Sequence, residues 1–213
     1  MLLDIDPDSV KGFLHPAEGA RLYQLGQEAA ALGPCLEVGS YCGKSTVYFG
    51  SGVRAGGGQL FSLDHHRGSE EHQRGEQYHD PELFDAKVGR MDSLPEFRRT
   101  LHRAGLEQNV IPIVADSAQL GQVWRIGLGA VFIDGGHSFA AAETDLNAWL
   151  PHLLPGGYLA VHDLFPSAEQ GGQAPRHIFE LAQASGLFEP PEQIETLGLL
   201  QRRALDGTGV AGK

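Results

Sequence analysis

The chain has 213 residues, of which 41% are hydrophobic and 20% charged, so it can bury a sizeable core and is not expected to be disordered. Its formal net charge of −11 argues against nucleic acid or an anionic membrane as a partner, because phosphate-rich surfaces are bound through basic faces. The acidic first ten residues are unlike a signal peptide and no apolar run is long enough to span a membrane, so we expect a cytoplasmic protein whose Cys35 and Cys42 stay reduced.

Helices and strands are expected to alternate along most of the chain. The first half contains a predicted helix at 17–32, a strand at 35–39, a helix that begins at Lys44, and strands at 59–64 and 110–115. The second half contains a strand at 130–134, a helix at 139–150, a strand at 157–163, a helix at 175–185, and an antiparallel pair formed by Phe188 and 194–201. This alternation predicts a single α/β domain over 1–213, with a mostly parallel sheet covered on both faces.

Two polar stretches interrupt the alternation. Residues 65–92 form a His- and Glu-rich insertion, which we interpret as a lid; a second metal site is the alternative, although the spacing matches no closed zinc pattern. Residues 166–174 form a Gly- and Gln-rich loop, and about 204–213 are expected to form a flexible tail. The side chains that select a ligand are expected in the two loops.

The segment from Glu37 to Thr46 is the first candidate binding loop. Gly39 and Gly43 let a ligand approach the backbone closely, and the following helix offers free N–H groups. The glycine spacing matches neither the GxGxxG of dinucleotide-binding proteins nor the GxxxxGK[ST] of phosphate-binding loops, which argues against an NAD dehydrogenase. Glu37 would repel a pyrophosphate and suits a cationic ligand.

The sequence LEVGSYCGKST at 36–46 resembles the first motif of class I S-adenosylmethionine methyltransferases. The resemblance spans about 17–165 and implies a Rossmann-like fold: a mostly parallel seven-stranded sheet with helices on both faces and an antiparallel C-terminal strand. It implies S-adenosylmethionine as the cofactor, with the ribose hydroxyls on Asp64 and the adenine beside Asp116 and Ser117. The cofactor-binding residues are then expected to be Glu37, Gly39, Ser40, Tyr41, Gly43, Ser45, Asp64, His65, Asp116, Ser117 and Asp134.

A second group of residues follows two neighbouring predicted strands, FIDGGH at 132–137 and VHDL at 161–164. Their carboxyl ends would bring Asp134, His162 and Asp163 to one rim. Two carboxylates and an imidazole are suitable ligands for Mg²⁺ or another divalent cation. The alternative is a hydrogen-bonded pair of His162 and Asp163 that only closes the sheet edge, with Asp134 contacting the cofactor alone.

The stretch 132–165 is similar to the branch of the family that contains sugar, macrolide and catechol-type O-methyltransferases. This similarity implies that Asp134 and His137 are catalytic, with His137 as the base that takes the proton of the acceptor. His162 departs from the pattern, since metal-dependent relatives often carry an acid there. His137 could instead be a helix N-terminal residue paired with a nearby carboxylate.

We therefore expect a methyltransferase that uses S-adenosylmethionine to methylate a hydroxyl of a small molecule, with or without a divalent metal. Two alternatives stay open: an N-methylating or hydroxylase-like relative of the same fold, and a protein that binds the cofactor without turnover. The expected partner is a small-molecule acceptor, and a homo-oligomer is compatible with the sequence.

Overall fold

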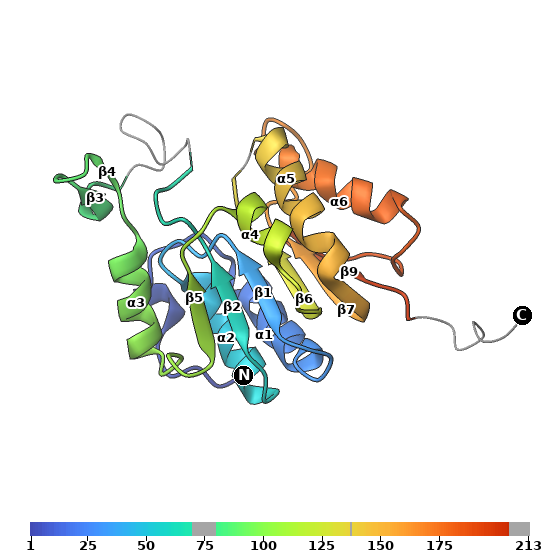
Figure 1. The fold of residues 1–213 in the computed structure, drawn as a ribbon, viewed down its shortest axis with the longest axis horizontal. Coiled ribbons are helices and arrows are strands. Elements are labelled where there is room, and N and C mark those ends of the chain that lie inside the picture. The colour runs from blue at the N-terminus through green and yellow to red at the C-terminus, as the bar shows by residue number, and fades with distance from the viewer. Residues whose placement is uncertain (70–79, 137, 205–213) are drawn as a thin grey trace, which may run out of the picture.

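Seven strands form one sheet between two layers of helices in the computed structural model, which describes residues 1–69, 80–136 and 138–204 (Figure 1). Their spatial order is β5 (Val110–Ile113), β2 (Leu60–Leu63), β1 (Cys35–Val38), β6 (Leu128–Ile133), β7 (Leu153–Val161), β9 (Leu197–Gln201) and β8 (Glu192–Ile194). Five strands run parallel, β9 runs antiparallel to its neighbour β7, and β8 pairs antiparallel with β9.

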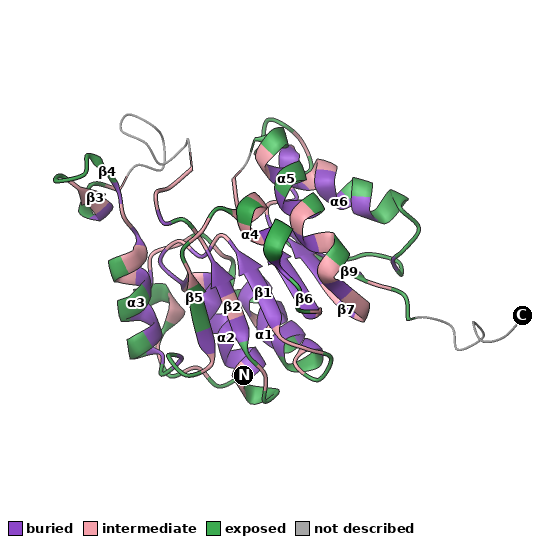
Figure 2. Ribbon diagram, viewed as in Figure 1, coloured by how far each residue is buried: buried purple, intermediate pink, exposed green. Residues whose placement is uncertain are grey.

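Each face of the sheet has its own hydrophobic core. Three helices supply the first core: α1 (Pro16–Ala29), α2 (Lys44–Ala55) and α3 (Leu94–Arg103). The opposite face is covered by α4 (Ser117–Val123), α5 (Phe139–Trp149) and α6 (Ala174–Ala184). Figure 2 shows the resulting pattern, with buried strands in the middle and helices that are exposed on their outer sides.

The short elements lie in the connections. These are the 3₁₀ helices η1 (Pro7–Ser9), η3 (Pro81–Leu83) and η4 (Leu150–His152), and a small hairpin of β3 (Phe84–Asp85) and β4 (Arg90–Met91). The hairpin belongs to the insertion predicted at 65–92, of which 70–79 lie outside the described residues. The predicted tail also lies outside them, apart from Ala204.

The predicted Rossmann-like fold with a mostly parallel seven-stranded sheet is confirmed. Three details differ. The strand expected at 157–163 already begins at Leu153. The segment 194–201 is two strands rather than one, because Glu195 takes a left-handed conformation (φ 50°) that turns the chain. Helices α3 and α4 had not been predicted.

Strand β5, at one edge of the sheet, contains a proline. Pro112 lies in the middle of β5, opposite Ser62 of β2. Asn109 and Ile113 direct their carbonyl groups to β2, accepting from the N–H groups of Leu60 and Asp64. Successive residues of a strand direct their backbone groups to opposite sides, so the nitrogen of Pro112 faces the open edge of the sheet. Proline has no N–H, but no hydrogen bond of the sheet is lost at this edge.

Among the described helices, none is long and apolar enough to cross a membrane.

Helices α1 and α2 pack closely because glycines lie at their contact. A Cβ on Gly52 of α2 would lie 2.0 Å from the carbonyl oxygen of Tyr23, and one on Gly26 of α1 would lie 2.6 Å from the nitrogen of Val53. Backbone atoms cannot move aside as a side chain can. The interhelical distance is therefore set by these two glycines.

We expect Gly52→Ala to lower the free energy of unfolding by about 1–3 kcal/mol, since an overpacked core costs that much. The loss should appear even though alanine favours a helix by about 1 kcal/mol over glycine. Denaturant titration measures it. Gly50→Ala in the same helix is the control: its Cβ would first meet the side chains of Val110 and Leu106, which can adjust. Equal stability of the two variants would contradict this account of the packing.

Candidate active site

A cavity of about 560 Å³ opens at the carboxyl ends of the parallel strands. Its walls come from the segments that follow β1, β2, β5, β6 and β7, together with residues near the N-terminus. Strands β1 and β6 are neighbours in the sheet. The strand that follows β1 in sequence, β2, lies on one side of this pair, and the strand that follows β6, β7, lies on the other, so the direction of strand addition reverses between β1 and β6. Open α/β sheets bind ligands at such a reversal.

The loop after β1 forms one wall of the cavity. Gly39 has φ 88°, and a Cβ there would lie 2.1 Å from the carbonyl oxygen of Asp134, so only glycine lets β1 and β6 end this close together. Ser40 lines the cavity, but the residue is only 2% exposed, and its buried Oγ has no hydrogen-bond partner among the described residues. A buried hydroxyl without a hydrogen-bond partner costs free energy.

Asp64, which follows β2, holds this loop in shape. Its Oδ2 accepts the backbone N–H groups of Ser40 (3.0 Å) and Tyr41 (2.8 Å), and its Oδ1 accepts that of His66 (2.7 Å). These bonds stabilise the left-handed conformations of Tyr41 (φ 47°) and His66 (φ 57°). A carboxylate has about four acceptor positions, so one is left for a ligand hydroxyl.

Glu37 and Gly43 do not line the cavity, although the sequence predicted them to be cofactor-binding residues. Glu37 is completely buried and accepts the hydroxyls of Ser45 (2.6 Å), Thr46 (2.6 Å) and Ser62 (2.8 Å). Burial raises its pKa to about 7, against the lowering effect of these three bonds. Gly43 faces α3 rather than the cavity. Both residues support the loop on the side that faces away from the cavity.

The other predicted cofactor residues do line the cavity: Gly39, Ser40, Tyr41, Ser45, Asp64, His65, Asp116, Ser117 and Asp134. Asp116 caps α4 by accepting the N–H of Gln119 (2.9 Å), and the hydroxyl of Ser117 accepts the indole N–H of Trp149 (2.8 Å). His66, in contrast, is buried against Ser93 and Phe97.

Asp145 is a cavity residue that the sequence analysis missed. It is 6% exposed on α5, and burial raises its pKa to about 6 while a hydrogen bond with Ser117 lowers it. Ala142, Leu146 and Trp149 share its helix face and are buried. An acid within the apolar face of a predicted helix was the signal that could have revealed it.

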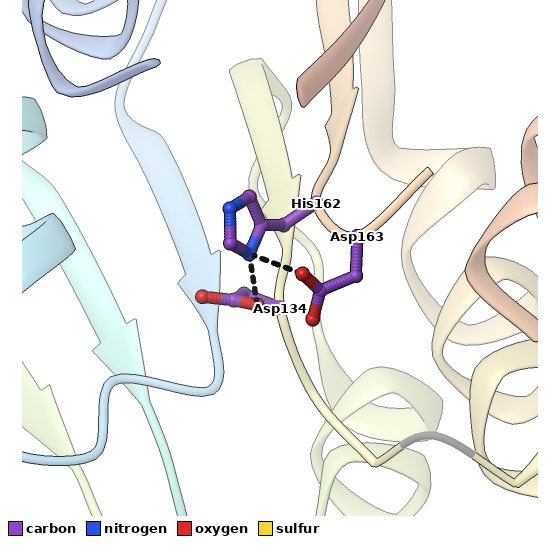
Figure 3. Close-up of side chains that lie close together, drawn as sticks. All are labelled: Asp134, His162 and Asp163. Carbon is purple, nitrogen blue, oxygen red and sulfur yellow. Dashed lines mark hydrogen bonds and ion pairs between the residues drawn. The ribbon is translucent and has the colours of Figure 1, made fainter. Parts of the chain in front are cut away.

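Asp134, His162 and Asp163 converge at the ends of β6 and β7 (Figure 3). Nδ1 of His162 lies 3.1 Å from Oδ1 of Asp134 and 3.4 Å from Oδ1 of Asp163. Its Nε2 lies 3.0 Å from Oε2 of Glu18, a residue of α1 that is 1% exposed. Three carboxylates therefore surround one buried imidazole.

These carboxylates keep His162 protonated. Burial lowers its pKa, but the charge of Asp134 and the hydrogen bonds to Asp134 and Glu18 outweigh burial and raise the pKa to about 11. For Glu18, burial favours the neutral acid, but the bonds from His162 and Thr196 prevail and lower its pKa to about 2. At neutral pH the centre is thus an imidazolium between carboxylates.

Glu18 was not identified as a site residue from the sequence. It accepts the backbone N–H of His15 (2.9 Å) as part of a helix capping box, and the N–H (2.8 Å) and hydroxyl (2.7 Å) of Thr196 between β8 and β9. The sequence signal, His15 followed three residues later by Glu18, indicates only where a helix begins. The contact with His162 joins residues 144 positions apart.

The predicted metal ligands fit one divalent cation. Asp134, His162 and Asp163 can each offer one ligand atom, and these atoms lie within 4.8 Å of one another. Glu18 on the far nitrogen of His162 matches the carboxylate that commonly orients a metal-binding histidine. Because the metal would use Nδ1, which otherwise carries a proton, metal and proton compete for that atom. The candidate base His137 lies outside the described residues.

A family model described as a methyltransferase domain matches residues 36–164. The chain belongs to this family. The prediction of a class I methyltransferase is thereby confirmed, and the matched range runs from the strand before the Gly39 loop to the residue after Asp163.

Solved O-methyltransferase structures share the fold. The enzyme from Bacillus cereus in complex with S-adenosylhomocysteine is 19% identical, with a TM-score of 0.61 over 89% of this chain and 83% of that one. TomG from Streptomyces achromogenes, in complex with S-adenosylmethionine and involved in tomaymycin synthesis, is 15% identical, with a TM-score of 0.63 over 90% and 82%. NovP is 16% identical, with a TM-score of 0.66 over 87% and 79%.

We expect Glu18→Gln to lower the pKa of His162 and to destabilise the fold by about 3 kcal/mol, as removal of one partner from a buried ion pair does. The folded-state pKa of Glu18 lies below its ordinary 4.5, so its contribution is lost as the pH falls toward 2. That of His162 lies above its ordinary 6.5, so its contribution is lost as the pH rises toward 11. The stability difference from wild type should therefore be largest between pH 4.5 and 6.5.

Denaturant titrations across this pH range and NMR of the His162 ring measure the two effects. Glu107→Gln is the control, because it disrupts a His102–Glu107 pair of the same 3.0 Å length whose side chains are 77% and 62% exposed. An exposed pair of this kind contributes little. A uniform, pH-independent loss in Glu18→Gln would argue against a charged pair.

Proposed function

We propose that the protein transfers the methyl group of S-adenosylmethionine to a hydroxyl of a small acceptor. The hydroxyl oxygen forms a bond to the methyl carbon, the bond from that carbon to sulfur breaks, and S-adenosylhomocysteine leaves while a base takes the hydroxyl proton. The observation that carries the proposal is one cavity that holds both the Gly39–Ser40 loop and the Asp134–His162–Asp163 cluster.

The cofactor end of the cavity suits a cationic nucleoside. The remaining acceptor position of Asp64 can bind a polar group of the cofactor. A polar wall of the cavity is formed at the start of α4, by Asp116 and Ser117, and on α5, by Asp145. Five aspartates line the described cavity, which favours a sulfonium over a pyrophosphate: Asp64, Asp116, Asp134, Asp145 and Asp163.

Methyl transfer to a hydroxyl also needs a base that takes the hydroxyl proton. We expect this base at the end of the cavity near Asp134, His162 and Asp163, here called the acceptor end. His162 cannot act first as this base at neutral pH, because the surrounding carboxylates raise its pKa to about 11 and it already holds a proton. We propose His137 for this role, as the sequence resemblance implies; its chain neighbours Gly136 and Ser138 both line the cavity. Asp134 then helps to orient the acceptor hydroxyl for in-line attack.

We propose in addition that Asp134, His162 and Asp163 hold a divalent cation when one is bound. Such an ion would lower the pKa of a coordinated hydroxyl. The imidazole favours an ion that accepts nitrogen ligands, such as Mn²⁺, over Mg²⁺, which prefers oxygen. Glu18 keeps His162 oriented with or without the ion.

The function is tested by turnover of wild-type protein with S-adenosylmethionine and ring-matched acceptors, phenols against anilines. Formation of S-adenosylhomocysteine with the phenols and a methyl ether as the product would support hydroxyl methylation. Product with the anilines alone would make the enzyme an N-methyltransferase. Cofactor binding without any product from either series would contradict the proposal.

Asp64→Ala should weaken S-adenosylhomocysteine binding by about 10- to 100-fold, the range for losing a hydrogen bond to a charged group together with the loop order it provides. Titration calorimetry gives the dissociation constant. Asp4→Ala is a matched control, because it also removes a partnered aspartate, on Arg54 at 2.8 Å, but lies outside the cavity. An unchanged constant in Asp64→Ala would refute the assigned role.

Chelator treatment followed by readdition of Mn²⁺ or Mg²⁺ tests the metal. We expect turnover to fall and to recover best with Mn²⁺, and Mn²⁺ binding measured by calorimetry to weaken at least about tenfold in Asp163→Ala. Binding should also weaken as the pH falls, because a proton must leave Nδ1 of His162 before the metal binds. Full activity in chelator would remove the metal from the reaction.

A further inference from the structure

Asp163 is held in an unusual backbone conformation. Its φ is 61°, in the left-handed region that is uncommon for residues other than glycine and that persists only where the surrounding structure enforces it. The chain turns here directly after β7, and Oδ1 of Asp163 lies 3.4 Å from Nδ1 of His162 at the acceptor end of the cavity. The groups that maintain this turn therefore decide where the carboxylate points.

Backbone hydrogen bonds engage the N–H groups of the turn. The N–H of Phe165 donates to the carbonyl of Asp163 (2.8 Å), and the N–H of Leu164 donates to the carbonyl of Thr196 between β8 and β9 (2.8 Å). The side chain of Leu164 is completely buried, and a Cβ on Gly198 would lie 2.2 Å from its Cδ1. The carbonyl groups of the turn need donors from another part of the chain.

Arg176 supplies these donors. Its Nε donates to the carbonyl of Phe165 (2.7 Å), and its Nη2 donates to the carbonyl of Leu164 (2.8 Å). A guanidinium group presents its N–H groups as a rigid, planar fork, so this one side chain fixes two successive peptide groups. Arg176 itself does not line the described cavity, and it reaches Asp163 only through the backbone of the turn.

Helix α6 fixes the position of Arg176. Ala174 and Pro175, which directly precede it, are buried. One turn later, Ile178 and Phe179 pack in the second hydrophobic core. The backbone of Arg176 is thus anchored on both sides, and its guanidinium group connects the turn after β7 to a helix that cannot move independently of the core.

The loop at 166–174 supports the same turn. The sequence had placed ligand-selecting groups in this loop, but none of its residues lines the cavity. A Cβ on Gly171 would lie 2.1 Å from Cδ2 of Phe165, so the phenyl ring covers the backbone of the loop. Nε2 of Gln173 donates to the carbonyls of Gly171 (3.1 Å) and Phe165 (3.4 Å). The loop therefore packs on the residues that follow Asp163.

We infer that Arg176 is a positioning residue, which aims the carboxylate of Asp163 at the acceptor end of the cavity by holding the two peptide groups that follow it. The importance of Arg176 for methyl transfer rests on the proposed function of Asp163. Its effect on the position of that carboxylate does not, and the two can be measured separately.

Arg176→Met removes the guanidinium group and keeps a long side chain. NMR at neutral pH reports the position of the carboxylate, because the Nδ1–H group of His162 lies beside it. We expect the 1H and 15N shifts of this group to move from the wild-type values toward those of Asp163→Ala. With S-adenosylmethionine and phenols, kcat should fall about 10- to 100-fold, the range for residues that orient a site residue from outside the site.

A double variant tests whether Arg176 acts through Asp163. In the Asp163→Ala background, Arg176→Met should lower kcat by less than about twofold further, because two substitutions that remove the same contribution are not additive. Arg176→Lys keeps the charge but lacks the planar fork, so its kcat should stay at least about threefold below wild type. It serves for the same comparisons if Arg176→Met does not fold.

Arg125→Met is the matched control. Arg125 also donates to two backbone carbonyls, those of Gln122 (2.9 Å) and Trp124 (2.6 Å), but neither it nor these partners line the described cavity. Its loss should change neither kcat nor the NMR signal of His162. All single variants should bind S-adenosylhomocysteine as wild type does, since the Gly39 loop is not altered.

The inference is overturned if Arg176→Met leaves the His162 signal at its wild-type position, or if the losses of the two single variants multiply in the double variant. A loss of S-adenosylhomocysteine affinity as large as the loss of kcat would also overturn it, because general loosening of the fold would then explain both. Failure of wild type to methylate any phenol would refute the proposed function, while the His162 signal would still decide whether Arg176 positions Asp163.

Discussion

The cavity depends on a buried imidazolium. His162 is 5% exposed and lies between Glu18 of α1 and Asp134 after β6, so one charged ring joins a helix on one face of the sheet to the ends of two central strands. Burying the charges of His162 and Glu18 is costly, and it is tolerated only when their polar atoms find partners. Glu18 meets this requirement through four hydrogen bonds, which also bind the start of α1 and the β8–β9 turn. The start of α1, the β8–β9 turn and the imidazole after β7 are therefore held by the same carboxylate.

Acids that look alike in the sequence serve different purposes in the structure. Glu37 and Asp64 both follow the rule that ligands gather at the carboxyl ends of parallel strands. Yet Glu37 is turned away from the cavity and joins three hydroxyls beneath the loop, whereas Asp64 faces the cavity and orders the loop from its side. Complete burial raises the pKa of Glu37 to about 7. The common feature is that each acid stabilises the Gly39 loop in a shape it could not hold alone.

Strand and helix periodicity, the glycine loop and the strand-end acids were sufficient to predict the fold, the family and the cavity residues that directly follow the parallel strands. These features are local, or they follow from parallel strands ending at one edge. The contacts of Glu18 and Asp145 are different, because they are made between segments distant in the chain and no local pattern encodes them. Helix α3 was missed although Phe97, Thr100 and Leu101 have helical spacing, since they follow directly on the polar insertion. His137 is predicted from its spacing to Asp134 alone.

The two outer strands of the sheet limit how copies of this chain can associate. On β5, Pro112 withholds an outward N–H from any strand that might pair with it. At the opposite edge, Glu192 of β8 is tied to Arg21 of α1 at 2.9 Å, which puts an ion pair beside the open ladder. Continuous sheets across subunits, and the fibrils that begin in the same way, are disfavoured at both ends. Pairing of edge strands is therefore a disfavoured route by which two copies of this chain could associate.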